Sequence, residues 1–176
     1  MKSPLPAELR PDQVTAIIDT REQLPLDLSP LRTVTGTLTT GDYSIYGLEQ
    51  IVAIERKSLG DFLSCVGGER DRFQRQVDRL VAFPVRALVI ETTWLELEAG
   101  AWRSKITANA AIGSLLGWIA QGVPVLLAGD HKRAGRYVSR LLFTAARRRW
   151  REARSLTATV NGKPKTANIS GDHVPF

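Results

Sequence analysis

The spacing of hydrophobic and polar positions changes at Ser58. Before this residue, apolar residues occur in short runs or alternate with polar ones, which predicts strands over 14–19, 31–39, 43–46 and 51–57. Turn-forming residues separate these segments, among them two prolines in 23–30 and the Thr40-Gly41-Asp42 turn. We therefore expect a mostly antiparallel meander over residues 14–57.

After Ser58 the apolar positions follow a helical period. Ser58 is a predicted N-cap, with Asp61 at the third helical position as in a capping box. A second helix is predicted over 69–82, followed by a strand over 85–91, while 92–105 has no assigned structure. Thr107 is expected to cap a helix through Ala120. Its expected apolar stripe is Ala111, Ile112, Leu115, Leu116 and Ile119.

The C-terminal part completes the predicted fold. A strand over 123–128 precedes a long helix from about Lys132 into 147–149. This order predicts the α/β class, a mixed β-sheet flanked by helices. We expect an N-terminal lead over 1–12, one domain over 13–154 and a polar, flexible tail over 155–176.

Composition limits the class of protein. The chain has 176 residues, of which 43% are hydrophobic, enough for a core of one domain. It shows no apolar run of about 18 residues and no signal-peptide core, and its one cysteine, Cys65, has no disulfide partner. A cytoplasmic protein without a membrane segment is therefore expected.

The positive charge is concentrated near the C-terminus. Of the net charge of +6, residues 130–154 carry +7, whereas residues 1–129 carry −2. This distribution suits an enzyme with an acidic metal site and a basic surface for a polyanion. From charge alone, a solvated helix surface is an equally good interpretation.

Candidate chemistry lies at the ends of the predicted strands. Alternation along 51–57 puts Glu55 and Lys57 on one face and Arg56 on the other. A hairpin can bring Asp42 next to Glu55, and Asp19 and Glu22 follow the first strand. Clustered carboxylates repel one another, and Mg²⁺ is the usual reason for assembling them. Taken singly, each has a plain structural interpretation: a turn residue, an exposed salt bridge or a helix-start charge.

These residues resemble a known family. The nuclease domain of the XPF/Mus/Hef structure-specific endonucleases, of the restriction-endonuclease-like PD-(D/E)xK superfamily, carries G-D followed by E-R-K-x-x-x-D. This chain has Gly41-Asp42 and Glu55-Arg56-Lys57-Ser58-Leu59-Gly60-Asp61. The D-x-R-E element of the family is present as Asp19-Thr20-Arg21-Glu22, and Arg72-Phe73, Gln76 and Arg79-Leu80 are similar to its arginine-bearing helix.

The resemblance implies roles for the matching residues. Asp42, Glu55 and the carbonyl of Arg56 would hold Mg²⁺ (or Mn²⁺). Asp19 and Glu22 would complete an acidic pocket and help bind a second ion, so Asp19 is also an expected metal ligand. Lys57 would act at the nucleophile or the phosphate, and Asp61 belongs to the signature. The expected DNA contacts are Arg72, Arg75 and Arg79 on one helix face, and Arg147, Arg148 and Arg149.

The predicted function is therefore a Mg²⁺-dependent DNA endonuclease acting on branched, flap or junction DNA in repair or recombination. The tandem helix-hairpin-helix motifs of the family have no match here, so a stand-alone domain is expected, with a possible homodimer through its last two helices. The alternatives are a catalytically inactive DNA-binding partner, or a restriction or resolvase-type nuclease on the same fold.

Overall fold

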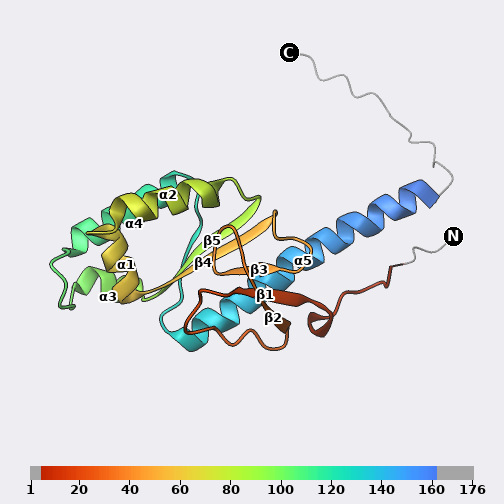
Figure 1. Cartoon of the computed structure of the whole chain (residues 1–176), viewed down its shortest axis with the longest axis horizontal. Coiled ribbons are helices and arrows are strands. Elements are labelled where there is room, and N and C mark those ends of the chain that lie inside the picture. Colours follow the sequence, from red (N-terminus) through yellow and green to blue (C-terminus); the bar gives the residue numbers. More distant parts are fainter. Residues whose placement is uncertain (1–4, 162–176) are drawn as a thin grey trace, which may run out of the picture.

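The computed structural model describes residues 5–161, and a mixed six-stranded sheet forms its centre. The strands lie in the order β2-β1-β3-β4-β5-β6 (Figure 1). Their bounds are β1 Thr15–Asp19, β2 Arg32–Gly36, β3 Tyr43–Ile45, β4 Val52–Ser58, β5 Val85–Glu91 and β6 Val125–Leu127. The fold confirms the predicted α/β class with a mixed sheet flanked by helices.

Helices cover both faces of the sheet. They are the 3₁₀ turn η1 Pro11–Gln13, and α1 Leu59–Val66, α2 Arg70–Val81, α3 Trp94–Ala99, α4 Ala108–Ala120 and α5 His131–Asn161. In Figure 1, α1 to α4 are grouped at one side, whereas α5 runs along the sheet and extends past it. None of the helices in this described part combines the length and apolar character that a bilayer crossing requires.

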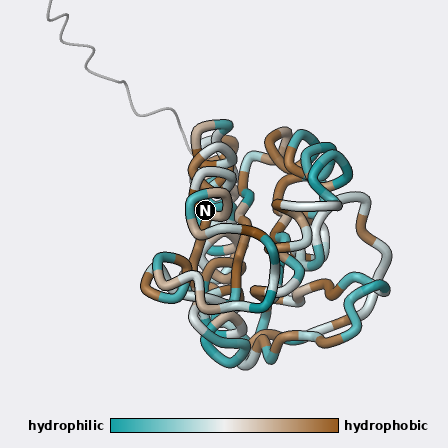
Figure 2. Tube along the Cα trace, turned by 90° about the vertical axis from the view of Figure 1, so that its left-hand side faces the viewer, coloured by the Kyte–Doolittle hydropathy of each residue, from teal (hydrophilic) through white to brown (hydrophobic). Residues whose placement is uncertain are grey.

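Strand alternation divides the core into two clusters. On β4, Val52 and Ile54 pack toward α5, while Ala53 packs toward α1, α2 and α4. On β5 the same alternation places Val89 on the α5 side and Leu88 on the other. Brown and teal alternate along the helices in Figure 2, as expected for elements that each bury one face. Three layers result, helix, sheet and helix.

The predicted antiparallel meander is wrong for its second strand. β2 pairs parallel to β1, Thr15 opposite Arg32, and it forms one edge of the sheet. β3 pairs antiparallel with both β1 and β4, so it lies between them. The connection over 20–31 is about the dozen residues that a parallel crossover requires. Residues 37–39, predicted as strand, lie beyond the end of β2.

The predicted stripe of α4 is wrong by about one position. Its buried residues are Ala111, Ser114, Leu115 and Trp118, whereas Leu116 and Ile119 are exposed. Trp118 turns the helix because its ring packs edge-on against two buried phenylalanines on α1 and α2. Burial of the Ser114 hydroxyl is offset by a 3.0 Å hydrogen bond from Arg70 Nη1.

Two further differences concern the connections. The segment over 92–105 contains α3, which begins at a capping box between Thr93 and Glu96 and ends at Gly100. The helix α5 continues through 155–161, which was predicted as tail. The rest of that predicted tail, 162–176, lies outside the described residues, as does the start of the N-terminal lead.

Candidate active site

Asp42 is held between the ends of β1 and β4. Its backbone N–H donates to the Ile54 carbonyl at 2.8 Å, and its carbonyl accepts from the Asp19 N–H at 2.8 Å. The preceding Gly41 has a φ of +80°, and a Cβ there would lie 2.9 Å from the Ile54 carbonyl oxygen. Only glycine fits this close approach, which explains the Gly-Asp pair in the sequence.

Glu55 and Lys57 lie on the same face of β4, as strand alternation predicts. The Lys57 ammonium forms an ion pair with Glu55 Oε1 and lies 5.5 Å from the centre of the Phe73 ring on α2. Burial alone would lower the Lys57 pKa, but the carboxylates of Glu55 and Asp42 outweigh it and raise the pKa. Lys57 is therefore a fixed positive charge beside two carboxyl groups.

The carboxyl group of Asp42 is the group whose ionisation this arrangement disfavours most. Burial and the nearby charge of Glu55 raise the pKa of Asp42 to about 7, although the Arg56 N–H and Lys57 oppose the shift. The Arg56 N–H donates to Asp42 Oδ2 at 2.7 Å. A divalent cation between Asp42 and Glu55 would offset their repulsion, so the donor set fits a hard metal ion.

These groups open into a cavity of about 190 Å³ at the ends of β3 and β4. Its lining joins the acidic floor to one face of α2 and to the loop before β3. The lining residues are Arg21, Thr39, Thr40, Gly41, Asp42, Glu55, Lys57, Arg72, Gln76 and Arg79. A pocket with two carboxylates, an ammonium and three guanidinium groups is suited to a phosphate diester held near a metal ion.

The α2 face in the pocket differs from the predicted one. Arg72 and Arg79 line the cavity as expected, but Gln76 lies between them and Arg75 points elsewhere. In a helix, positions i+3 and i+4 lie on opposite sides of the line that joins positions i and i+7, so residues 75 and 76 flank the line from Arg72 to Arg79 on different sides. Here Phe73, Val77 and Leu80 determine the buried side.

Asp19 is buried, but its carboxylate does not line the pocket. Its two oxygens accept hydrogen bonds from the backbone N–H groups of Arg21 and Leu38 and from the guanidinium of Arg21, at 2.6–3.1 Å. Burial would raise the Asp19 pKa, but these donors hold it below its usual value. In this structure Asp19 orients Arg21 at the cavity rim.

Glu22 and Asp61 also lie away from the cavity lining. Glu22 Oε2 accepts from the Tyr43 hydroxyl at 3.3 Å, and Glu22 Oε1 lies 3.6 Å from Arg56 Nη1. Asp61 accepts from the Ser58 hydroxyl at 2.6 Å while its own N–H donates back to that oxygen, which confirms the predicted capping box. The signature aspartate therefore fixes the start of α1 just after Lys57.

Arg56 points to the opposite face of β4, as predicted. Its guanidinium contacts Glu91 on β5 and His131 at the start of α5, neither of which was singled out from the sequence. These partners are 35 and 75 residues away. The register of β4 and β5 could have indicated Glu91, whereas the position of His131 depends on the packing of α5.

The arginine run 147–149 lies far from the cavity. Arg148 and Arg149 pair with Glu152, and Arg149 borders a groove with Val14 and Tyr46, at the ends of β1 and β3 that face away from Asp42. Since α5 covers the other face of the sheet, the structure does not join this run to the acidic pocket (Figure 1).

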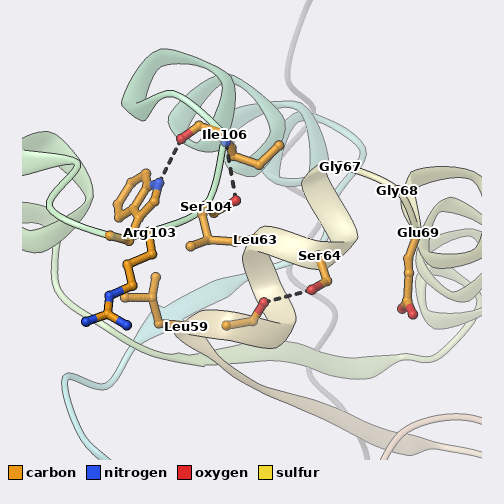
Figure 3. Close-up of a pocket in the computed structure, with 11 residues that line it drawn as sticks. Leu59, Leu63, Ser64, Gly67, Gly68, Glu69, Arg103, Ser104 and Ile106 are labelled. Carbon is orange, nitrogen blue, oxygen red and sulfur yellow. Dashed lines mark hydrogen bonds between the residues drawn. The ribbon is translucent and has the colours of Figure 1, made fainter.

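A larger cavity, of about 610 Å³, lies between α1 and the loop over 102–106 (Figure 3). Apolar side chains such as Leu59 and Leu63 line it, and the Trp102 indole N–H donates to the Ile106 carbonyl at 2.7 Å. It contains none of the predicted catalytic residues. Size alone therefore does not mark the site with the relevant chemistry.

The described residues contain no group of three or more His, Cys, Asp or Glu side chains placed to hold a metal ion. Asp42 and Glu55 are two carboxylates. This number suits Mg²⁺, which commonly takes one or two carboxylates and completes its octahedron with waters and substrate phosphate.

Comparisons with known proteins identify the family and the fold. The ERCC4 domain family model matches residues 13–141. The solved structure of XPF from Aeropyrum pernix is similar in fold, with a TM-score of 0.62 and 17% sequence identity, over 85% of this chain and 75% of that chain. No curated protein sequence matches significantly. The family model spans well over half of the sequence, so this chain belongs to the ERCC4 domain family and folds as an XPF-type nuclease domain.

Proposed function

We propose that the protein is a Mg²⁺-dependent endonuclease that hydrolyses phosphodiester bonds in DNA. The observation that carries the proposal is the convergence of Asp42, Glu55 and Lys57 on one cavity, whose rim bears Arg21, Arg72 and Arg79. A catalytically decayed domain of this fold would have no reason to retain two repelling carboxyl groups beside a half-buried lysine.

Some of these residues would bind the metal ion, and Lys57 would act on the substrate. Asp42, Glu55 and the carbonyl of Arg56 would hold Mg²⁺, which when bound neutralises charge on the scissile phosphate and acidifies a bound water. Lys57 would place its ammonium beside the phosphate or the attacking water. Because its pKa is raised, Lys57 is charged at neutral pH and serves as an electrostatic group.

The charge of the rim supports a polyanionic substrate. The Arg21 guanidinium is oriented by Asp19 at 2.6 Å while its side chain remains 69% exposed, so it can meet a phosphate without losing its support. Arg72 is likewise exposed, and its guanidinium pairs with Glu69 at 3.3 Å. We propose branched, flap or junction DNA as the substrate, on the strength of the family resemblance.

A homodimer through the last two helices is part of the same proposal. The outer face of α4 exposes Leu116 and Ile119, and α5 exposes Tyr137. Exposed apolar side chains of this size are candidates for burial at a protein interface. The acidic pocket lies on a different part of the fold, so a dimer of this kind would leave it open.

The test is a cleavage panel of duplex, single strand, 3′ flap, 5′ flap, fork and four-way junction, each with Mg²⁺, Mn²⁺ or EDTA. Asp42→Ala and Glu55→Gln should each lower cleavage by at least about 100-fold, because each removes a metal ligand, while DNA binding in EDTA is retained. Asp78→Ala is the matched control, an exposed carboxylate on α2 whose partner is Gln74.

Two outcomes would overturn the assignment. Full activity of the Asp42→Ala variant would show that the cavity is not where the chemistry occurs. Cleavage of no substrate by the wild type, together with tight DNA binding, would identify the chain as the non-catalytic binding partner instead.

A further inference from the structure

Arg56 lies at the centre of a buried ionic cluster on the face of the sheet opposite to the catalytic pocket. Its Nε and Nη2 lie 2.8 and 2.7 Å from Glu91 Oε1, and Nη2 lies 3.1 Å from His131 Nδ1. Glu22 adds a second carboxylate, 3.6 Å from Nη1. We refer to Glu22, Arg56, Glu91 and His131 as the Arg56 cluster.

The cluster joins four separate elements at one end of the sheet. Glu22 follows β1, Arg56 is on β4, Glu91 is the last residue of β5 and His131 is the first residue of α5. The side chain of Arg56 is 9% exposed and that of Glu91 is 13% exposed. A guanidinium buried to this degree is stable only while its carboxylate and imidazole partners stay in place.

The Arg56 backbone transmits this anchoring to the pocket. Its side chain is held on the α5 face of the sheet, while its backbone N–H donates to Asp42 Oδ2, at 2.7 Å, at the pocket. This bond is one of the interactions that orient the Asp42 carboxylate. A shift of the Arg56 side chain would move the peptide group that Asp42 uses as its partner.

We infer that Glu91 and His131 are positioning residues for the active site, acting through Arg56. They hold the end of β4 so that the Asp42 carboxylate and the Arg56 carbonyl keep a geometry suited to a divalent cation. This inference rests on the proposed metal-dependent function, which it extends to two residues outside the pocket. Groups that support metal ligands typically change metal affinity or activity about 10–100-fold when removed.

The contacts of His131 suggest two substitutions that separate its polar contacts from its bulk. Its Nδ1 lies 2.8 Å from Glu91 Oε1 and 3.1 Å from Arg56 Nη2. One nitrogen either donates to the carboxylate or accepts from the guanidinium, depending on the tautomer. An asparagine at this position offers an N–H and a carbonyl oxygen on separate atoms, so it can serve both partners. Leucine has similar bulk and serves neither.

The first measurement is the affinity of the full chain for Mn²⁺ in the absence of DNA, by titration calorimetry or electron spin resonance. His131→Leu and Glu91→Gln should weaken Mn²⁺ binding by about 10-fold, and His131→Asn should stay within about twofold of the wild type. The matched control is Arg133→Ala. It removes an exposed ion pair between Arg133 and Asp130, which lie one helical turn apart at the start of α5. DNA affinity in EDTA should be unchanged in all four variants.

The second measurement is hydrogen exchange of the Arg56 amide in metal-free protein. His131→Leu should raise its exchange rate by about 10-fold relative to other amides of β4, and His131→Asn should restore it. Because no metal is present, this comparison still decides the inference if the wild type binds no Mn²⁺ and cleaves nothing, a result that would sink only the proposed function.

Three results would overturn the inference. In the first, His131→Leu matches Arg133→Ala in both Mn²⁺ affinity and Arg56 exchange. In the second, His131→Asn is as impaired as His131→Leu, which would show that the polar contact is irrelevant. In the third, all amides of the sheet exchange faster in proportion, which would identify a general loss of stability.

Discussion

Asp42 shows how a single carboxyl group can couple the chemistry of the site to the stability of the fold. Its pKa is raised to about 7 by burial and by Glu55, so folding favours its neutral form when no metal is bound. The stabilisation from the neutral form is complete below the ordinary aspartate pKa. It is lost as the pH rises through about 7. Without metal, the site therefore weakens the protein at the pH at which it is expected to work.

This coupling predicts the behaviour of Asp42→Asn. At pH 8 without metal, the variant should melt roughly 2–8 °C above the wild type. It removes about 1–2 kcal/mol of carboxylate repulsion, and each kcal/mol shifts Tm by about 2–4 °C in a chain of this size. The difference should shrink between pH 7 and pH 4, as measured by calorimetry.

Added Mg²⁺ provides the internal check, because a ligand raises Tm only when it binds the folded state. It should raise the Tm of the wild type at pH 8 and leave Asp42→Asn unchanged. A Tm difference that does not vary with pH would contradict the raised pKa.

At the scale of elements, α2 presents two functional faces at once. Phe73 and Val77 enter the core, while Arg72 and Arg79 line the pocket and Arg75 is exposed elsewhere. The three arginines look alike in the sequence, and only the rotation of the packed helix separates them. Their contributions to DNA binding should therefore differ.

We predict that replacing both Arg72 and Arg79 by alanine weakens DNA binding and lowers the slope of log affinity against log salt by about 2, since about two phosphate contacts are lost. Arg75→Ala should change the slope by much less than 1. Binding isotherms over a range of salt concentrations measure both. A drop of about 1 in the slope for Arg75→Ala would place all three arginines on the DNA.

Helical glycines give a second element-scale prediction. A Cβ at Gly135 on α5 would lie 2.6 Å from the Asp27 carbonyl oxygen, whereas Gly113 and Gly117 on α4 have open space. Gly135→Ala should destabilise the protein, although alanine favours helix by about 1 kcal/mol. Gly113→Ala should stabilise by up to that amount. Denaturant unfolding distinguishes them, and a stable Gly135→Ala variant would show that α5 can withdraw from the loop.

The sequence predicted elements well where local chemistry determines them. The Ser58–Asp61 cap, the Thr107 cap and the bounds of β5 depend on neighbouring residues, and the structure confirms them. The parallel pairing of β2 and the rotation of α4 depend on contacts distant in sequence. The Trp118 packing that turns α4 involves Phe62 and Phe73, which no periodicity within α4 could reveal.

The candidate site was likewise predictable where neighbouring strands determine it, and not where side-chain geometry does. Asp42, Glu55 and Lys57 are brought together by adjacent strands and were expected together. Asp19 was expected to face the metal, but the local turn supplies Arg21 as its partner. Whether a carboxylate faces a metal or an arginine is decided by side-chain geometry, which strand-end position alone does not encode.

At the scale of the whole molecule, positive charge is distributed over two distant regions. The pocket rim lies at one end of the strands, and the run 147–149 lies 16–18 residues along α5 from His131. At 1.5 Å per residue, this is about 24–27 Å. A DNA duplex rises about 3.4 Å per base pair, so a continuous track over both regions would need about 8 base pairs.

This separation predicts a length dependence. Replacing Arg147, Arg148 and Arg149 by alanine should weaken binding of DNA whose arm extends more than about 8 base pairs from the cleavage point, and leave shorter DNA unaffected. The rate of cleavage at saturating DNA should not change. Affinity measured against arm length tests this, and a uniform loss at all lengths would mean that the run contacts DNA at the pocket itself.

β4 carries the pocket-facing and the anchoring residues on alternate positions of one short strand. Glu55 and Lys57 face the pocket, and Arg56 faces Glu91 and His131. Inserting or deleting one residue in 52–54 would exchange these faces, burying a carboxylate and an ammonium against α5 and pointing the guanidinium at the phosphate. Mutational drift in this strand is thus confined to substitutions at constant length.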